Sequence, residues 1–322
     1  MPDLSQNIPS MATATAASIA APSPLAAIWE ATKPRITRLV TITSGIGFTL
    51  AALPRRWEWT ELAVTATAVL LGTGLSAAGA NALNQWLERD RDALMPRTCN
   101  RPLPEQRLSP AAALAAGSVL AVAGVGLLWG LCGPAPALVS LTTVLVYLLL
   151  YTPLKPVTPH ATLVGAVPGA LPPLIGYSAA AATGLRSLIE PGALALFAIM
   201  FIWQIPHFLA IAWMYRDDYA KGGYRVLPVV DSDGRRTGRA MVLWAALLIP
   251  AAMAPAWTMK PVAAWAYGLL ALAMGVGYLL LVVRAAQSKE RADARRAFIA
   301  SVIHLPLLLM LIVACAALSR ML

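Results

Sequence analysis

The sequence predicts an all-α, polytopic membrane protein. Of its 322 residues, 58% are hydrophobic and only 12% are charged, and the mean hydropathy is +0.67. These values are typical of membrane proteins and exclude an ordinary soluble domain. A membrane-spanning helix needs about 20 apolar residues. Runs close to that length predict nine membrane helices, at residues 36–53, 63–84, 110–131, 135–151, 162–181, 191–214, 239–258, 262–283 and 297–318.

Residues 1–29 differ in composition from the rest of the chain. They are rich in Ala, Ser, Thr and Pro, and the first basic residue is Lys33. We therefore expect a disordered tail at 1–29 and one transmembrane domain at 30–322. A secretory signal begins with basic residues and a mitochondrial transit peptide is rich in Arg. The tail fits neither pattern, which favours a bacterial inner membrane.

The basic residues predict the orientation of the chain. With the N-terminus inside, 20 of the 25 Lys and Arg residues fall in cytoplasmic segments. Because basic loops stay on the cytoplasmic side, this predicts a cytoplasmic N-terminus and a periplasmic C-terminus. The net charge of +10 then reflects these loops and contacts with membrane lipid or an anionic substrate, and not nucleic acid. Three scattered cysteines form no disulfide or zinc pattern.

Acidic and amide side chains gather where the second apolar run ends. Asn84, Glu88 and Asp92 recur every four residues, so on a helix they lie within an arc of about 80°. Aligned oxygen ligands of this kind suit Mg²⁺. Arg97 and Arg101 follow, and could hold an anion carried by that cation. The alternative is a solvated cap at the membrane edge whose spacing arises by chance.

A second polar segment follows the sixth apolar run. His207 and Asp218 are eleven residues apart, so on one continuous helix they would differ by about 20° in direction and about 16 Å in height. Asp217 adds a second carboxylate. An ionisable group inside a membrane helix is a functional candidate, although His207 could simply bond to Gln204.

Two further features lie between these segments. Lys155 closes the fourth run, where it either contacts an anion or anchors the helix at the interface. Residues 165–176 contain three prolines in six positions, which break a helix. Broken backbone at membrane depth is tolerated where it is buried in protein or lines a cavity.

Carboxylates and cations above an apolar interior suit a lipid diphosphate bound through Mg²⁺. The metal and basic groups neutralise the charge that develops on a departing diphosphate. Loss of diphosphate from an allylic lipid leaves a carbocation, which an apolar cavity protects from water. An electron-rich acceptor can then attack it. A cation transporter is disfavoured, because no carboxylate lies in the middle of a predicted span.

The motifs resemble those of the intramembrane (UbiA-type) prenyltransferases. The segment Asn84–Leu103 is similar to their first acidic motif, and its ending Met95–Leu103 is similar to the branch that acts on protohaem IX. The segments Tyr151–Lys155, Gly165–Pro173, Trp203–Phe208 and Tyr215–Tyr219 also resemble that branch. The resemblance covers residues 30–318. Glu88 departs from the pattern, because many relatives have Asp there, and Pro156 and His160 depart from it in the middle loop.

The resemblance implies nine helices around a central cavity and a farnesyl transfer from farnesyl diphosphate to a vinyl group of haem b. Mg²⁺ is the implied cofactor, and the product is haem O. Haem-pathway or oxidase-assembly proteins are implied partners. The alternative is a prenyltransferase for an aromatic quinone precursor. By position, the implied catalytic or metal-binding residues are Asn84, Glu88, Asp92, His207, Asp217 and Asp218, and the implied diphosphate-binding residues are Arg97, Arg101, Lys155 and Lys221.

Overall fold

The computed structural model describes residues 23–181 and 183–322, and this part of the chain contains helices and no strand. The all-α prediction is confirmed. The helices are α1 (Pro24–Ala31), α2 (Pro34–Ala52), α3 (Trp59–Asp92), α4 (Pro110–Cys132), α5 (Pro134–Leu145), η1 (Val146–Tyr151), α6 (Thr152–Leu154), α7 (Ala161–Ala170), α8 (Pro172–Ala180), η2 (Gly184–Ile189), α9 (Pro191–Met214), α10 (Arg216–Lys221), α11 (Leu227–Val230), α12 (Arg235–Met253), η3 (Ala254–Thr258), α13 (Pro261–Ser288) and α14 (Arg291–Met321).

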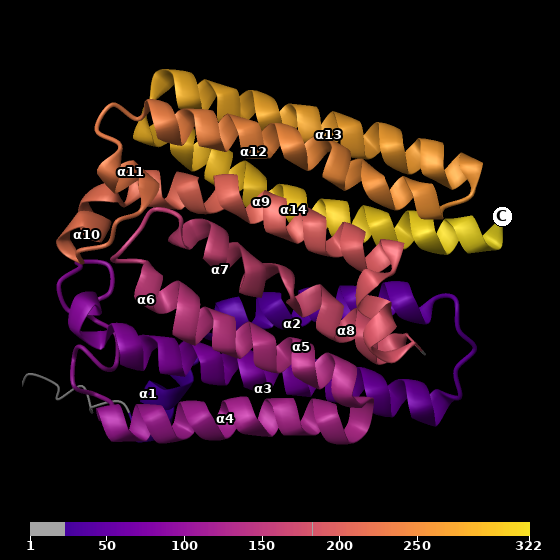
Figure 1. Cartoon of the computed structure of the whole chain (residues 1–322), viewed down its shortest axis with the longest axis horizontal. Helices are drawn as coiled ribbons and strands as arrows, with labels where there is room; N and C mark the ends of the chain where they lie inside the picture. Colours follow the sequence, from indigo (N-terminus) through magenta and orange to yellow (C-terminus); the bar gives the residue numbers. More distant parts are fainter. Residues whose placement is uncertain (1–22, 182) are drawn as a thin grey trace, which may run out of the picture.

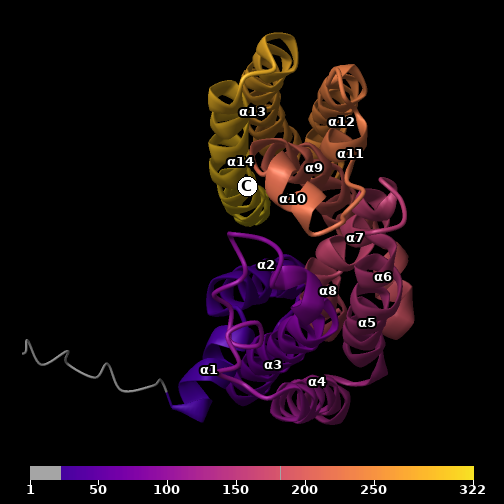
Figure 2. The same cartoon turned by 90° about the vertical axis from the view of Figure 1, so that its left-hand side faces the viewer.

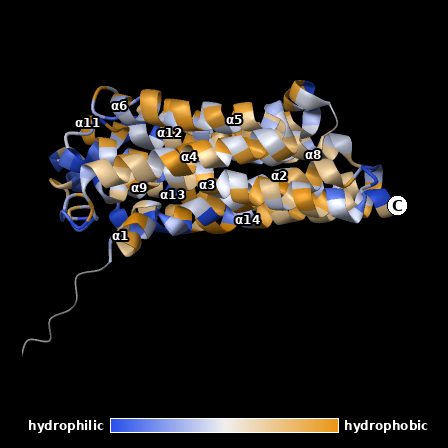
Figure 3. Cartoon of the chain, turned by 90° about the horizontal axis from the view of Figure 1, so that it is seen from below, coloured by the Kyte–Doolittle hydropathy of each residue, from blue (hydrophilic) through white to orange (hydrophobic). Residues whose placement is uncertain are grey.

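The long helices run side by side along the longest axis of the molecule (Figure 1). Seen from one end, α2–α5 lie in one half, α9 and α12–α14 lie in the other, and α7 and α8 lie between the two halves (Figure 2). The short helices α10 and α11 cover one end. Apolar residues dominate the middle of the bundle and hydrophilic residues gather at both ends (Figure 3), as expected of a bundle that crosses a membrane.

Eight helices or joined helix pairs in the described residues are long and apolar enough to cross a membrane. They match eight of the predicted runs. The remaining run, 36–53, corresponds to α2, which has 19 residues and packs against α3 and α8. Arg35, Arg38 and several Ser and Thr residues make it less apolar. The total of nine membrane helices and the orientation of the chain remain predictions.

Small residues let the first helices approach one another closely. At Gly79 of α3 and Gly124 of α4, an added Cβ would collide with the backbone of the facing helix. The proline-rich run divides into α7 and α8 at Leu171, and α8 begins with Pro172. Both parts are largely enclosed by protein, which explains how broken backbone is tolerated at this depth.

The predicted disordered tail at 1–29 includes six residues that are helical in the structure. Residues 24–29 belong to α1, which starts with Pro24 after an N-cap at Ser23, whose Oγ accepts a hydrogen bond from the backbone of Ala26. Pro at the first helical position and Ser at the N-cap both favour a helix start. Residues 1–22 lie outside the described part of the chain.

A cavity of about 640 Å³ lies between the two halves, bordered by α2, α8, α9, η3 and α14. Leu50, Leu196 and Ile312 form part of its apolar wall, and Glu190 and Arg320 lie at its polar margin. Its lining includes Arg320, close to the C-terminus, and the C-terminus lies at the end of the bundle opposite α10 (Figure 1). The cavity is therefore separate from the acidic side chains at the end of α3.

Candidate functional site

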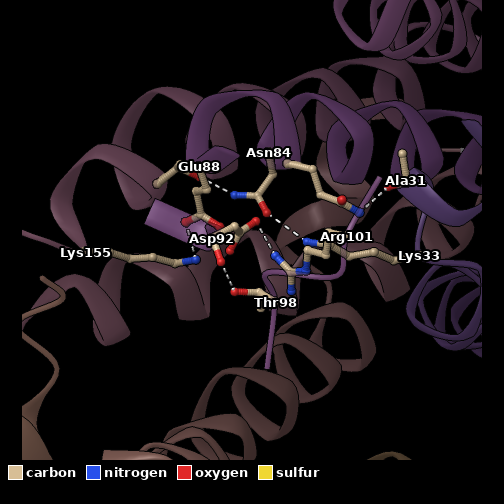
Figure 4. A network of polar contacts seen from close by, with 10 residues as sticks. Ala31, Lys33, Asn84, Glu88, Asp92, Thr98, Arg101 and Lys155 are labelled. Atoms are coloured by element: carbon tan, nitrogen blue, oxygen red, sulfur yellow. Dashed lines mark hydrogen bonds and ion pairs between the residues drawn. The ribbon is translucent and has the colours of Figure 1, made fainter. Parts of the chain in front are cut away.

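The site begins with one face of α3 at its C-terminal end. Asn84, Glu88 and Asp92 are only 1%, 5% and 1% exposed, and they point into one polar network (Figure 4). Their spacing accounts for this arrangement, because residues four apart lie on the same side of a helix. A solvated cap with chance spacing does not describe side chains that are this deeply buried.

Three cations hold these side chains, two of them from distant segments of the chain. Lys155 Nζ lies 2.7 Å from Glu88 Oε1, and Arg101 Nη1 lies 2.6 Å from Asp92 Oδ2. Lys33 Nζ donates to Asn84 Oδ1 at 2.8 Å. A buried carboxylate needs such a partner, because desolvation of an isolated charge is costly. The network therefore places two carboxylates and one amide against three cations.

Local structure positions each cation. A π-helical turn, η1, precedes Lys155, and such turns often occur at functional sites. Arg101 lies in the loop after α3, which is anchored by the Thr98 hydroxyl bond to the Asp92 backbone oxygen at 2.8 Å. The Asn84 amide donates to Thr152 Oγ1 at 3.0 Å, which links α3 to α6. The resemblance implied a role for Arg101 and Lys155, and the structure brings both to Glu88 and Asp92.

Lys33 is a site residue that sequence reasoning missed, since it served only as evidence for orientation. It occupies the junction of α1 and α2 with a φ of 50°. Burial, together with the nearby Arg101 charge, lowers the pKa of Lys33 to about 7. Lys155 behaves differently: burial opposes its charge, but the Glu88 carboxylate holds the pKa of Lys155 well above its usual value. The sequence signal that could have indicated Lys33 is the pair Lys33-Pro34 directly before an apolar run.

The second acidic segment does not continue the preceding helix. Helix α9 ends at Met214, Tyr215 has φ −117° and ψ 29°, and α10 starts at Arg216. The prediction that His207 and Asp218 share one continuous face is therefore wrong. Asp217 and Lys221 are exposed and Asp218 is half-buried. Among the described residues, none of these three side chains makes a hydrogen bond or ion pair.

Aromatic and backbone contacts nevertheless connect the two acidic segments. The guanidinium of Arg97 lies 5.2 Å from the ring centroid of Tyr215 and 5.6 Å from that of Tyr219. Arg91 Nη1 donates to the Gly222 oxygen at 3.0 Å. The loop after α3 and the segment around α10 therefore lie against one another at the same end of the bundle.

Tyr224 is a second site residue that the sequence did not reveal. It is 3% exposed, and its hydroxyl has no hydrogen-bond partner among the described residues. Its ring centroid lies 5.7 Å from Lys155 Nζ and 5.9 Å from the Arg91 guanidinium carbon. Burial raises the pKa of Tyr224, so the hydroxyl keeps its proton. A buried donor without a partner beside a cluster of cations fits an anionic ligand.

The donor set is suited to Mg²⁺ that arrives with phosphate oxygens. In the described residues, no three His, Cys, Asp or Glu side chains converge closely enough to hold an ion. Mg²⁺ is commonly bound through one or two carboxylates, with water and substrate phosphates completing its coordination. Glu88, Asp92 and the Asn84 amide provide such a partial set.

The histidines occupy three different environments. His207 Nδ1 lies 2.7 Å from Ser301 Oγ on α14. Gln204 is not its partner, because the Gln204 amide donates to the backbone oxygens of Ala166 and Met200. His304 is 5% exposed, whereas His160 is exposed in the loop before α7.

Comparisons with known proteins identify the family of this chain. The UbiA prenyltransferase family matches residues 39–318. A protoheme IX farnesyltransferase of Solibacter usitatus (strain Ellin6076) is 43% identical over 284 residues, which is 87% of this chain and 94% of the relative.

Solved structures share the fold at low identity. A digeranylgeranylglyceryl phosphate synthase has a TM-score of 0.72 and 14% identity, covering 91% of this chain and 99% of its own. A UbiA homologue from Archaeoglobus fulgidus bound to GPP and Mg²⁺ has a TM-score of 0.63 and 15% identity, covering 89% of this chain and 99% of its own. The chain therefore belongs to the UbiA prenyltransferase family, in its protoheme IX farnesyltransferase branch.

Proposed function

We propose that this membrane enzyme transfers a farnesyl group from farnesyl diphosphate to a vinyl carbon of haem b and so produces haem O. The observation that carries the proposal is the buried network in which Glu88 and Asp92 meet Lys155 and Arg101. Such a network suits a bound diphosphate, and the identity of 43% with a protoheme IX farnesyltransferase supports haem as the acceptor.

Binding of the diphosphate would rearrange the charges of this network. Mg²⁺, held by Asn84, Glu88 and Asp92 and by Asp217 or Asp218, would neutralise charge on the departing diphosphate. Lys155 and Arg101 would then exchange part of their contact with the carboxylates for phosphate oxygens. Lys33, which bonds to Asn84, and the Tyr224 hydroxyl, beside Lys155, would add further donors. Arg97 and Lys221, near the exposed margin, would act mainly through charge.

The reaction forms one carbon–carbon bond. The allylic C–O bond of farnesyl diphosphate breaks, and its electron pair leaves with the diphosphate. The π electrons of the haem vinyl group form the new bond to the farnesyl carbon, and water adds to the resulting cation and loses a proton. The apolar interior of the bundle would keep water from the allylic cation until the acceptor has reacted.

The remaining proposals concern location. We place α10 and the acidic network on the cytoplasmic side of a bacterial inner membrane, and the C-terminus on the periplasmic side. The excess of Lys and Arg in the segments near α10 supports this orientation. Haem-pathway or oxidase-assembly proteins would deliver haem b or receive the product.

The decisive experiment is a product assay. The purified protein, in detergent or lipid discs, is incubated with haem b, farnesyl diphosphate and Mg²⁺, and the pigments are analysed by mass spectrometry. We expect haem O, and no product when Mg²⁺ is removed by a chelator. Failure of a folded preparation to make haem O, combined with prenylation of an aromatic quinone precursor, would replace haem by that acceptor.

A further inference from the structure

Two histidines lie within long apolar helices of the bundle, His207 on α9 and His304 on α14, and their surroundings differ. Nε2 of His304 is sealed inside the protein and has no hydrogen-bond partner among the described residues. Nε2 of His207 also has no partner there, but it is not among the enclosed atoms, and the side chain is only half-buried. Of these two Nε2 atoms, that of His207 is therefore the less enclosed.

Hydrogen counting assigns the tautomer of His207. Ser301 Oγ donates its only hydrogen to the Phe298 backbone oxygen, at 2.6 Å. Toward His207, at 2.7 Å, Ser301 Oγ can consequently only accept. With the serine hydrogen on the Phe298 oxygen, we infer that Nδ1 of His207 carries the ring hydrogen and that the neutral ring keeps its lone pair on Nε2.

Aromatic neighbours hold the ring of His207 in this orientation. Trp203 stacks on it with centroids 4.8 Å apart and planes 25° apart, and Phe298 lies 5.1 Å away. Trp203 Nε1 also donates to the Ser301 backbone oxygen at 2.9 Å. One turn of α9 is thereby connected through two hydrogen bonds to one residue of α14, and these helices lie side by side (Figures 1 and 2). The free Nε2 edge is held in a defined direction.

We propose that Nε2 of His207 binds the iron of the acceptor haem, and that Ser301 is the positioning residue that fixes the required tautomer. This inference rests on the proposed function. A metal-binding histidine commonly donates its other N–H to an oxygen acceptor, which orients the ring and raises its basicity. Neutral imidazole is a frequent axial ligand of haem. An iron bond would set the position of the macrocycle, and hence which vinyl group faces the allylic carbon.

The test compares two porphyrins that differ only in the iron. Ferric haem and metal-free protoporphyrin IX are titrated into the full-length protein and into His207→Ala. We expect His207→Ala to weaken haem binding about 10- to 100-fold and to shift the Soret band, while protoporphyrin binding stays unchanged. Added imidazole should restore the original haem spectrum. Equal weakening for both porphyrins, or an unchanged Soret band, would overturn the iron bond.

The role of Ser301 is tested with the same spectra. Ser301→Ala should weaken haem binding about tenfold and alter the Soret band, whereas Ser301→Thr keeps the hydroxyl and should retain the wild-type spectrum. His304→Gln is the matched control and should leave the spectrum unchanged. A wild-type spectrum in Ser301→Ala, or a loss confined to His304→Gln, would contradict the assignment.

Product formation by the wild-type protein separates this inference from the proposed function. Haem O formation together with an unchanged haem spectrum in His207→Ala would leave the function standing and remove the iron ligand. Absence of prenylated haem from a wild-type preparation that binds haem through His207 would remove the proposed reaction and leave the iron ligand standing.

Discussion

The two acidic segments at one end of the bundle are built in opposite ways. Glu88 and Asp92, at the end of α3, are buried and paired with Lys155 and Arg101. On α10, Asp217 is exposed and Asp218 is half-buried. Neither carboxylate has a hydrogen-bond or ion-pair partner among the described residues. The first segment is thus a rigid half-site whose charges are already balanced. The carboxylates of the second segment are free to bind a ligand, but no hydrogen bond or ion pair holds them among the described residues.

The largest expected effect comes from removing a carboxylate of the rigid half-site. Asp92→Ala should lower kcat/KM for farnesyl diphosphate by at least about a hundredfold, because the metal loses a ligand and Arg101 loses its partner. Asp90→Ala is the matched control: Asp90 lies two residues away, has a side chain that is 84% exposed and pairs only with Arg89 at 3.6 Å. Comparable activity in the two variants, by steady-state kinetics, would remove Asp92 from the site.

The next largest difference between the two segments should be in the effect of their carboxylates on the free energy of unfolding. Glu88→Ala leaves Lys155 buried without its partner and should lower the free energy of unfolding by about 3 kcal/mol. Asp218→Ala removes no hydrogen bond and should change the free energy of unfolding by less than about 0.5 kcal/mol, although its kcat/KM should fall as that of Asp92→Ala does. Thermal unfolding followed by tryptophan fluorescence measures both. The double variant Glu88→Ala/Lys155→Ala should recover part of the lost stability, and no recovery would contradict the pairing.

A smaller effect is expected at the boundary between the segments. Tyr224→Phe removes a buried hydroxyl that has no partner among the described residues, so the protein should be at least as stable as the wild type. Affinity for Mg²⁺-diphosphate should fall about fivefold, because the ligand loses one hydrogen bond. Tyr219→Phe serves as the control. A stable variant with undiminished affinity in calorimetric titration would show that the Tyr224 hydroxyl does not contact the ligand.

The smallest effect concerns the contact that joins the segments. Arg97 lies over the rings of Tyr215 and Tyr219, and exposed cation–π contacts contribute about 0.5–1 kcal/mol. Arg97→Gln should therefore raise KM for farnesyl diphosphate about threefold and leave kcat nearly unchanged. Arg97→Lys retains the charge, and its KM should lie between those of the wild type and Arg97→Gln. A loss of kcat in place of a rise in KM would assign Arg97 a direct part in the chemistry.

Prediction from sequence worked where a side chain's position follows from helical periodicity. Asn84, Glu88 and Asp92 share one face because they are four residues apart on an uninterrupted helix. The same rule failed for His207 and Asp218, because the helix is interrupted at Tyr215, between the end of α9 at Met214 and the start of α10 at Arg216. The residues Pro24–Trp29 were mistaken for tail, since eight residues make too short a helix to leave a clear periodic signal.

The sequence by itself determined the all-α membrane class, the apolar segments and the polar face of α3, because hydropathy and helical spacing are local properties of the chain. Only the tertiary structure decided which cations meet which carboxylates, that Lys33 and Tyr224 lie beside them, and that Ser301 contacts the ring of His207. Arg101 and Asp92 are nine positions apart in the chain, and the other hydrogen-bonded pairs are 51 to 94 positions apart. They depend on how helices pack, which no local pattern encodes.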